Sequence, residues 1–96
     1  MSARTSHAVI AQVGRLTRLQ SLNLHDSSIT DSGLVHLKGL TNLSVVLLYR
    51  TQVSDAGLVH VKRLTNLSVL LLECTHVTDA GVNELKRALP SLRIHH

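Results

Sequence analysis

Histidine is the residue type in this sequence that most suggests metal binding, and the sequence contains seven histidines. Imidazole nitrogens bind zinc at about 2.1 Å, and two histidines at positions i and i+4 of one helix are a common zinc-binding pair. No two histidines here have that spacing, and the only adjacent pair is His95 and His96. His36 and His60 lie far apart in the sequence, with His25 before them. We interpret these side chains as solvated surface histidines and expect no metal site.

The second reactive group is a thiol, Cys74, the single cysteine of the sequence. One cysteine rules out an intramolecular disulfide and a cysteine-based zinc site, and it is consistent with a reducing, cytoplasmic location. A catalytic thiol needs a nearby base or a helix N-terminus, and the sequence places neither beside Cys74. There is also no glycine-rich phosphate loop and no nucleophile motif. We therefore expect a non-enzymatic protein without a cofactor, in which Cys74 is an inert thiol.

Basic residues give the sequence a formal net charge of +4. This charge makes nucleic acid and anionic lipid candidate ligands. The charges are segregated, with basic residues at Arg15, Lys38, Lys62, Arg63, Lys86 and Arg87 and acidic residues at Asp31, Asp55 and Asp79. Such segregation complements the dipole of a helix and needs no ligand. With one Tyr and no Trp or Phe, there is no aromatic platform for stacked bases. We expect no nucleic-acid binding, and no apolar run approaches the ~18 residues of a membrane span.

These residues belong to a 24-residue unit that recurs in tandem. Three copies align without a gap, at residues 16–39, 40–63 and 64–87. In the first half of a copy, apolar residues such as Val46 and Leu48 alternate with their neighbours, which predicts a strand with one buried face. In the second half they recur every third residue, as at Leu58, Val61 and Leu64, which predicts one face of a short helix. A fixed period of this length is typical of a stacked solenoid, with parallel strands inside and helices outside.

Each helix is expected to begin at a Ser/Thr-Asp pair. The three pairs are Thr30-Asp31, Ser54-Asp55 and Thr78-Asp79, and each is followed by a glycine at Gly33, Gly57 or Gly81. The hydroxyl would cap free N–H groups of its own helix, and the Asp would meet the positive end of the dipole. Because Gly costs about 1 kcal/mol relative to Ala inside a helix, we infer that neighbouring units approach too closely there for a Cβ. Thr51 and Thr75, with Ser27, are expected to form a hydroxyl ladder that satisfies backbone groups of the turns.

The pattern Leu-x-x-Leu-x-Leu-x-x-Thr-x-Val-x-Asp-Ala-Gly-Leu resembles the leucine-rich repeat family, and is closest to 24-residue bacterial-type repeats akin to those of F-box proteins. The second copy matches at Leu43, Val46, Leu48, Thr51, Val53, Asp55, Ala56, Gly57 and Leu58, and the third at Leu67, Leu70, Leu72, Thr75, Val77, Asp79, Ala80, Gly81 and Val82. In the first copy Ser27 replaces the Thr and Ser32 the Ala. The resemblance implies an α/β fold, a right-handed solenoid shaped as a horseshoe arc. Its parallel sheet would be concave and carry the ligand, and its helices would be convex.

The two ends of the sequence depart from the 24-residue unit. Ile10 and Val13 stand one full period before Leu34 and Leu37, so we interpret residues 1–15 as the helical half of a preceding repeat rather than a targeting peptide. Residues 88–96 match the unit only after one extra residue, and we expect them to close the array. Within them, alternating Leu92 and Ile94 predict a last short strand. Residues 1–96 are therefore predicted to form one domain.

Strand alternation also predicts the side chains of the concave face, which are the candidate binding residues. They are Asn23, His25, Val45, Leu47, Tyr49, Val69, Leu71 and Glu73. Because adjacent strands lie about 4.8 Å apart, Val45, Leu47, Val69 and Leu71 would form an apolar square with Tyr49 at its edge and a polar rim. Such a patch is typical of a protein–protein site, including self-association. Strand propensity in a parallel sheet, or a surface covered by further sequence, would also account for it.

From these observations we predict a non-enzymatic module that presents a concave sheet to a protein partner. The resemblance to F-box repeats raises a second function, substrate recognition in a ubiquitin-ligase-like adaptor, although residues 1–96 contain no segment that could be an F-box. A third hypothesis is a terminal piece of a longer leucine-rich-repeat array with a structural role.

Overall fold

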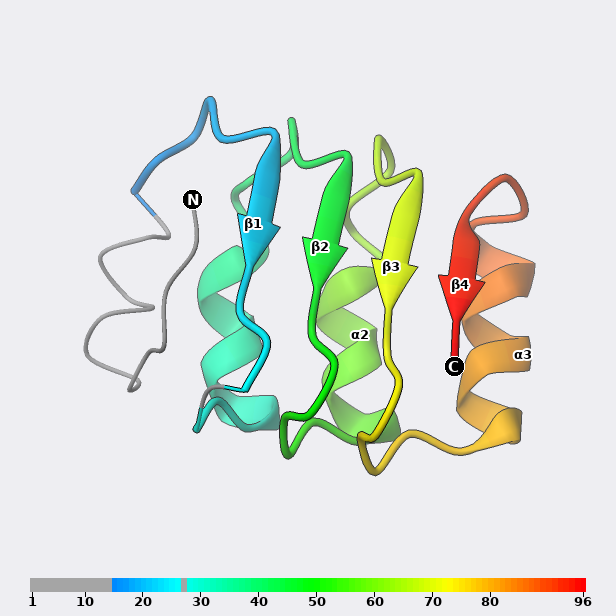
Figure 1. The fold of residues 1–96 in the computed structure, drawn as a ribbon. Coiled ribbons are helices and arrows are strands. Elements are labelled where there is room, and N and C mark those ends of the chain that lie inside the picture. The colour runs from blue at the N-terminus through cyan, green and yellow to red at the C-terminus, as the bar shows by residue number, and fades with distance from the viewer. Residues whose placement is uncertain (1–14, 27) are drawn as a thin grey trace.

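The computed structural model describes residues 15–26 and 28–96, so the predicted half-repeat at 1–15 lies almost wholly outside the described residues. Four short parallel strands form one sheet in chain order: β1 (Ser21–Asn23), β2 (Val45–Leu47), β3 (Val69–Leu71) and β4 (Arg93–His95). Figure 1 shows them side by side with the helices on one face only. Leu22 pairs with Val46, and Val46 with Leu70, which are equivalent residues of successive copies. The sequence period therefore equals one step across the sheet.

The helical halves of the three units differ in length and type. They are η1 (Asp31–Leu37), η2 (Asp55–Gly57), which continues into α2 (Leu58–Val61), and α3 (Asp79–Ala88). The first is a 3-10 helix rather than an α-helix, and its apolar spacing of three residues fits the three residues per turn of that helix. No helix in the described part of the chain has the length and apolar content to cross a bilayer.

A single aliphatic core fills the space between the sheet and the helices. The inward strand residues Leu22, Val46 and Leu70 are fully buried, as are the helix residues Leu34 and Leu85. Within this core Thr51 is the only buried polar residue among the described residues, and its Oγ1 donates to the carbonyl of Leu48 at 2.6 Å. Thr75 makes the same bond to the carbonyl of Leu72. The predicted hydroxyl ladder is thus confirmed at these two positions, while Ser27 lies outside the described residues.

The Ser/Thr-Asp pairs make a contact that the sequence reasoning did not anticipate. Asp31 accepts hydrogen bonds from the backbone N–H of Ser54 at 2.6 Å and from the Ser54 hydroxyl at 2.5 Å. The side chains of Thr30 and Ser54 do not cap their own helices, so the cap prediction was wrong for these two. Only Thr78 acts as predicted, accepting from the backbone N–H of Gly81 at 3.3 Å. The motif therefore joins one repeat to the next, because Asp31 reaches Ser54 of the second unit and Asp55 likewise reaches Thr78 of the third.

The same contact explains the glycines. A Cβ built on Gly81 would lie far inside van der Waals contact of the Asp55 carboxylate, and a Cβ on Gly57 would collide in the same way with Asp31. The expectation that neighbouring units approach too closely for a Cβ is confirmed at both positions. At Gly81 the atoms that need the space belong to Asp55, and at Gly57 they belong to Asp31 and Leu34 of the preceding repeat.

The three turns that follow the strands share an uncommon backbone conformation. Asp26, Arg50 and Cys74 have φ of 56°, 58° and 57°, in the left-handed region that costs most residues about 1–2 kcal/mol. In the repeat these three positions are equivalent, so the turn geometry is retained although the residue type changes. Asparagine and aspartate tolerate this region best after glycine, which fits Asp26 and leaves Arg50 and Cys74 as the strained members.

The last strand corrects the prediction for residues 88–96. β4 consists of Arg93, Ile94 and His95, and Leu92 lies before it rather than in it. Arg93 pairs with Val69 and Ile94 with Leu70, which keeps the 24-residue offset despite the extra residue in front of Leu89. The chain compensates because no residue separates Leu92 from its strand, whereas Ser68 separates Leu67 from Val69.

The side chain of His96 makes a hydrogen bond that a backbone N–H group of the following repeat makes in the first two units. The N–H groups of Gln52 and His76 donate to the carbonyls of Ile29 and Val53 at 3.3 and 3.0 Å. The equivalent carbonyl, that of Val77, accepts from His96 Nε2 at 2.7 Å. The other ring nitrogen, Nδ1, lies 3.4 Å from the carboxylate of Asp79.

Candidate functional site

The candidate site lies on the face of the sheet opposite the helices, which we call the open face. Its outward strand residues form two rows across the sheet: Ser21, Val45, Val69 and Arg93, and Asn23, Leu47, Leu71 and His95. The pairing brings Val45 beside Val69 and Leu47 beside Leu71, so the predicted apolar square is formed. All four side chains are half-buried, in contrast to the fully buried inward residues.

Two residues of the open face were missed in the sequence. Arg93 and His95 continue the two rows beyond Val69 and Leu71 and place a polar, exposed border on that side of the apolar square. They were missed because the candidate rows were drawn only from the three full repeats, although inward alternation about Ile94 already places Arg93 and His95 outward. The signal that could have found them is the 24-residue offset itself, counted from Val69 to Arg93.

At the C-terminal ends of the strands the polar rim is organised around two rings. His25 and Tyr49, which are equivalent in the repeat, stack with their ring centroids 4.8 Å apart and an interplanar angle of 10°. Asn23 orients the histidine, because its side-chain oxygen accepts from the backbone N–H of His25 at 3.1 Å and also contacts Nδ1 of the ring. Three of the predicted binding residues thus form one unit, and the stack holds Tyr49 in one orientation.

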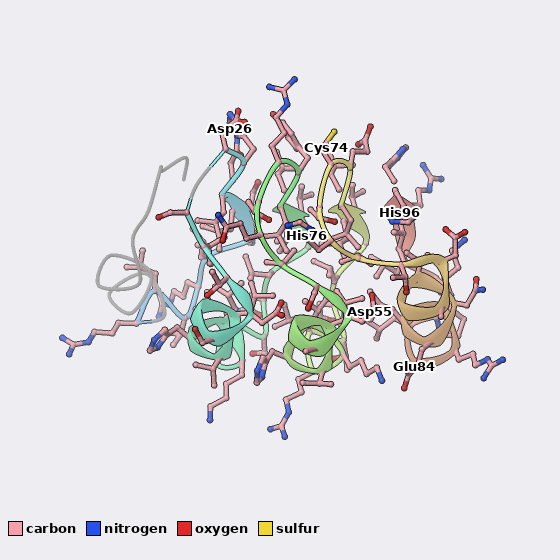
Figure 2. The ribbon with its side chains drawn as sticks, turned by 90° about the horizontal axis from the view of Figure 1, so that it is seen from below. Asp26, Asp55, Cys74, His76, Glu84 and His96 are labelled. Carbon is pink, nitrogen blue, oxygen red and sulfur yellow. The ribbon has the colours of Figure 1, made fainter. Side chains whose placement is uncertain are left out.

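Beside this unit the turns form a hollow of about 370 Å³, lined by Tyr49, Arg50, Leu71, Glu73 and Cys74. Arg50 turns toward the first repeat, where its Nη1 lies 3.7 Å from the Asp26 carboxylate. Glu73 forms no ion pair within the described residues. Cys74 is exposed, and Figure 2 shows both Asp26 and Cys74 on the side of the sheet away from the helices.

Asp55, whose pKa is lowered, lies in the helical layer and not on the open face (Figure 2). The hydroxyl of Thr78, and then its backbone N–H, hold the pKa of the Asp55 carboxyl below its ordinary value of 3.8. The charge of His96 acts in the same direction. This perturbation has a structural cause, the junction between the second and third repeats, and it does not mark a reactive group.

The described residues contain no cluster of three or more His, Cys, Asp or Glu side chains that could hold a metal ion. His36 and His60 project from the helical layer, one exposed and one half-buried. His25 is engaged with Asn23 and Tyr49, as described above. What the open face offers is therefore an apolar centre, an aromatic ring held in place and a few separated charges.

Comparison with known proteins finds similarity at the level of fold. Neither the protein-family models nor the curated protein sequences give a match. The Chaetomium Mex67:Mtr2 subunits include a chain that matches with a TM-score of 0.75 and 18% identity, over 94% of this chain and 69% of that one. A leucine-rich-repeat protein of Leptospira interrogans matches with a TM-score of 0.63 and 19% identity. An internalin of Listeria monocytogenes, InlF, matches with a TM-score of 0.54 and 20% identity.

The last two matches cover 90% and 88% of this chain but only 27% and 36% of the respective proteins. This chain therefore has the length of a small part of those longer arrays. The parallel sheet, the helices on one face and these neighbours together define a mixed α/β fold of the leucine-rich-repeat type.

Proposed function

We propose that this protein is a non-enzymatic binding module that docks a protein partner on the open face of its sheet. The observation that carries the proposal is the apolar square of Val45, Leu47, Val69 and Leu71, which lies on the face that no helix of the described chain covers. Apolar patches with polar rims are typical of interaction sites. Asn23, His25, Tyr49 and Glu73 supply the rim on the side of the turns.

We further propose that the repeats belong to the 24-residue bacterial type and that the array is a right-handed horseshoe arc with this face concave. Parallel strands joined by a crossover are right-handed in about 98% of cases, which supports the handedness. Internal repetition supports a rigid scaffold, because each unit packs on its neighbours through the same contacts. A rigid surface loses little conformational entropy when it binds.

The partner is proposed to be a protein, with a second copy of this chain as one form of it. Substrate recognition in an F-box-like adaptor remains an alternative, supported only by the type of repeat. The lengths of the Leptospira and Listeria proteins, of which this chain spans 27% and 36%, favour a second alternative, a structural segment of a longer array.

The test is a charge inserted into the apolar square. Leu47→Glu with Leu71→Glu is expected to abolish association, measured as mass by size-exclusion chromatography with light scattering for self-association and by binding titration for a purified partner. The matched control is Val59→Glu, since Val59 is 51% exposed on the helical layer. Both proteins should keep a cooperative thermal melt by circular dichroism.

Unchanged association in the Leu47→Glu, Leu71→Glu protein would rule out the open face as the binding surface. Loss of association in the Val59→Glu protein alone would move the interface to the helices. A non-cooperative melt of the unsubstituted chain would favour the hypothesis of a segment from a longer array.

A further inference from the structure

The hollow beside Tyr49 has features that the apolar square lacks, and they specify a ligand chemistry. One face of the Tyr49 ring is covered by His25, which lies on the β1 side at a centroid distance of 4.8 Å. The hollow lies on the opposite side, toward β3, where Leu71, Glu73 and Cys74 complete its wall. The structure thus leaves the second face of a fixed aromatic ring turned toward an open space.

The charge of this space is set by Glu73. Arg50, the other charged residue of the wall, forms an ion pair with Asp26 at 3.7 Å, on the far side of Tyr49. Glu73 is exposed and pairs with no cation among residues 15–26 and 28–96. The backbone N–H of Arg50 donates to the carbonyl of Glu73 at 2.9 Å, which keeps the two turns adjacent. A carboxylate without an ion pair among the described residues therefore lines the same hollow as Tyr49.

An aromatic face beside a carboxylate is complementary to a guanidinium group. A guanidinium stacks on an aromatic ring, donates two parallel hydrogen bonds to a carboxylate and is more weakly hydrated than an ammonium group. Leu71 would pack against the aliphatic stem of the same side chain, as long basic side chains cover apolar surface with their methylenes. We infer that the hollow receives an arginine side chain of the protein partner. This inference rests on the proposed function, because it assigns a specific anchor to the same face.

The experiment uses a small probe, so that it does not depend on knowing the partner. Nα-acetyl-arginine amide is titrated into the protein, and amide chemical shifts are followed by NMR. Tyr49 is the only Tyr in a sequence without Trp or Phe, so intrinsic fluorescence reports on the same ring. We expect saturable shifts at Tyr49, Leu71 and Glu73 and none with the citrulline analogue, which has the same shape without the charge.

Two variants separate a built site from general attraction of a cation. Glu73→Gln should weaken binding about tenfold, because it removes a charge-assisted pair. Glu84→Gln changes the net charge equally but lies on α3, where Glu84 pairs with Lys62 at 2.9 Å, and it should leave binding unchanged. Tyr49→Leu should weaken binding about threefold and Tyr49→Phe should not, since Phe retains the ring face.

Shifts spread over the whole surface, equal binding of citrulline, or equal losses in Glu73→Gln and Glu84→Gln would overturn the inference. This outcome is distinguishable from failure of the proposed function. If Leu47→Glu with Leu71→Glu abolishes association while arginine amide does not bind, the open face is the interface and only the arginine anchor is wrong.

Discussion

Asp55 and Thr78, in successive copies of the repeat, hold the second and third units together through one carboxylate. Oδ1 accepts from the Thr78 backbone N–H at 2.8 Å, and Oδ2 accepts from the Thr78 hydroxyl at 2.5 Å. Asp31 and Ser54 repeat this geometry one unit earlier. The motif that marks the start of each helix in the sequence is therefore also the element that spaces one unit from the next.

The first prediction separates this junction from the helix dipole. Asp55→Asn should lower the free energy of unfolding by about 1–2 kcal/mol, because an amide cannot accept both hydrogen bonds. Asp79→Asn is the matched control: Asp79 also stands in the first turn of its helix, but its side chain is 94% exposed and its one ion pair within the described residues is with His96. We expect a change within about 0.5 kcal/mol there. Urea unfolding measures the change in unfolding free energy for both variants. Equal losses would indicate that both aspartates act through the helix dipole.

The second prediction concerns acid. The Asp55 pKa is lowered in the folded state from its ordinary value of 3.8, chiefly by the hydroxyl and backbone N–H of Thr78. The unfolded chain therefore binds this proton more readily than the folded chain does. The stabilisation is fully present above pH 3.8 and is lost as the pH falls through the folded-state pKa. Melting temperatures measured from about pH 6 to pH 2 should fall less steeply at the acid end in Asp55→Asn. Parallel curves for the two proteins would contradict this assignment.

The third prediction tests the reason for the glycines. Gly81→Ala should destabilise the protein by about 1–3 kcal/mol, since the new methyl group displaces the Asp55 carboxylate. Gly39→Ala is the control, because a Cβ there meets nothing within 4 Å and the residue has no positive φ. It should be neutral or stabilising by up to about 1 kcal/mol. In the background of Asp55→Ala the cost of Gly81→Ala should shrink, and an undiminished cost would mean that another contact needs the glycine.

The fourth prediction concerns the strained turn at Arg50, whose φ is 58°. Arg50→Gly should be more stable than Arg50→Ala by about 1 kcal/mol, since only the alanine keeps a Cβ in the left-handed region. Both substitutions remove the contact with Asp26, so the comparison isolates the backbone. Thermal melts of the pair give the difference, and an alanine variant as stable as the glycine variant would show that the turn relaxes without cost.

Much of this architecture could be predicted from periodicity. Alternation and every-third spacing placed the strands and the inward leucines, because burial on one face of a strand or helix leaves a direct trace in residue type. The apolar square followed as well, since a constant 24-residue step brings Val45 beside Val69 and Leu47 beside Leu71. The close approach at Gly57 and Gly81 could be inferred from the presence of a costly residue at the same place in each copy.

Other features were decided by contacts between units, and no local pattern reports them. The partner of Asp55 lies in the next copy of the repeat, so the sequence around the aspartate favours a dipole role that any helix start would share. Pairing with β3 also decided where the last strand begins: Arg93 pairs with Val69, so Leu92 lies before the strand, although its alternation with Ile94 predicted it inside. The hollow beside Tyr49 likewise exists only in three dimensions.

The sequence by itself determined the repeat and its buried face, because these depend on hydrophobicity alone. Tertiary structure decided which polar groups meet, because that depends on how closely one unit stacks on the next.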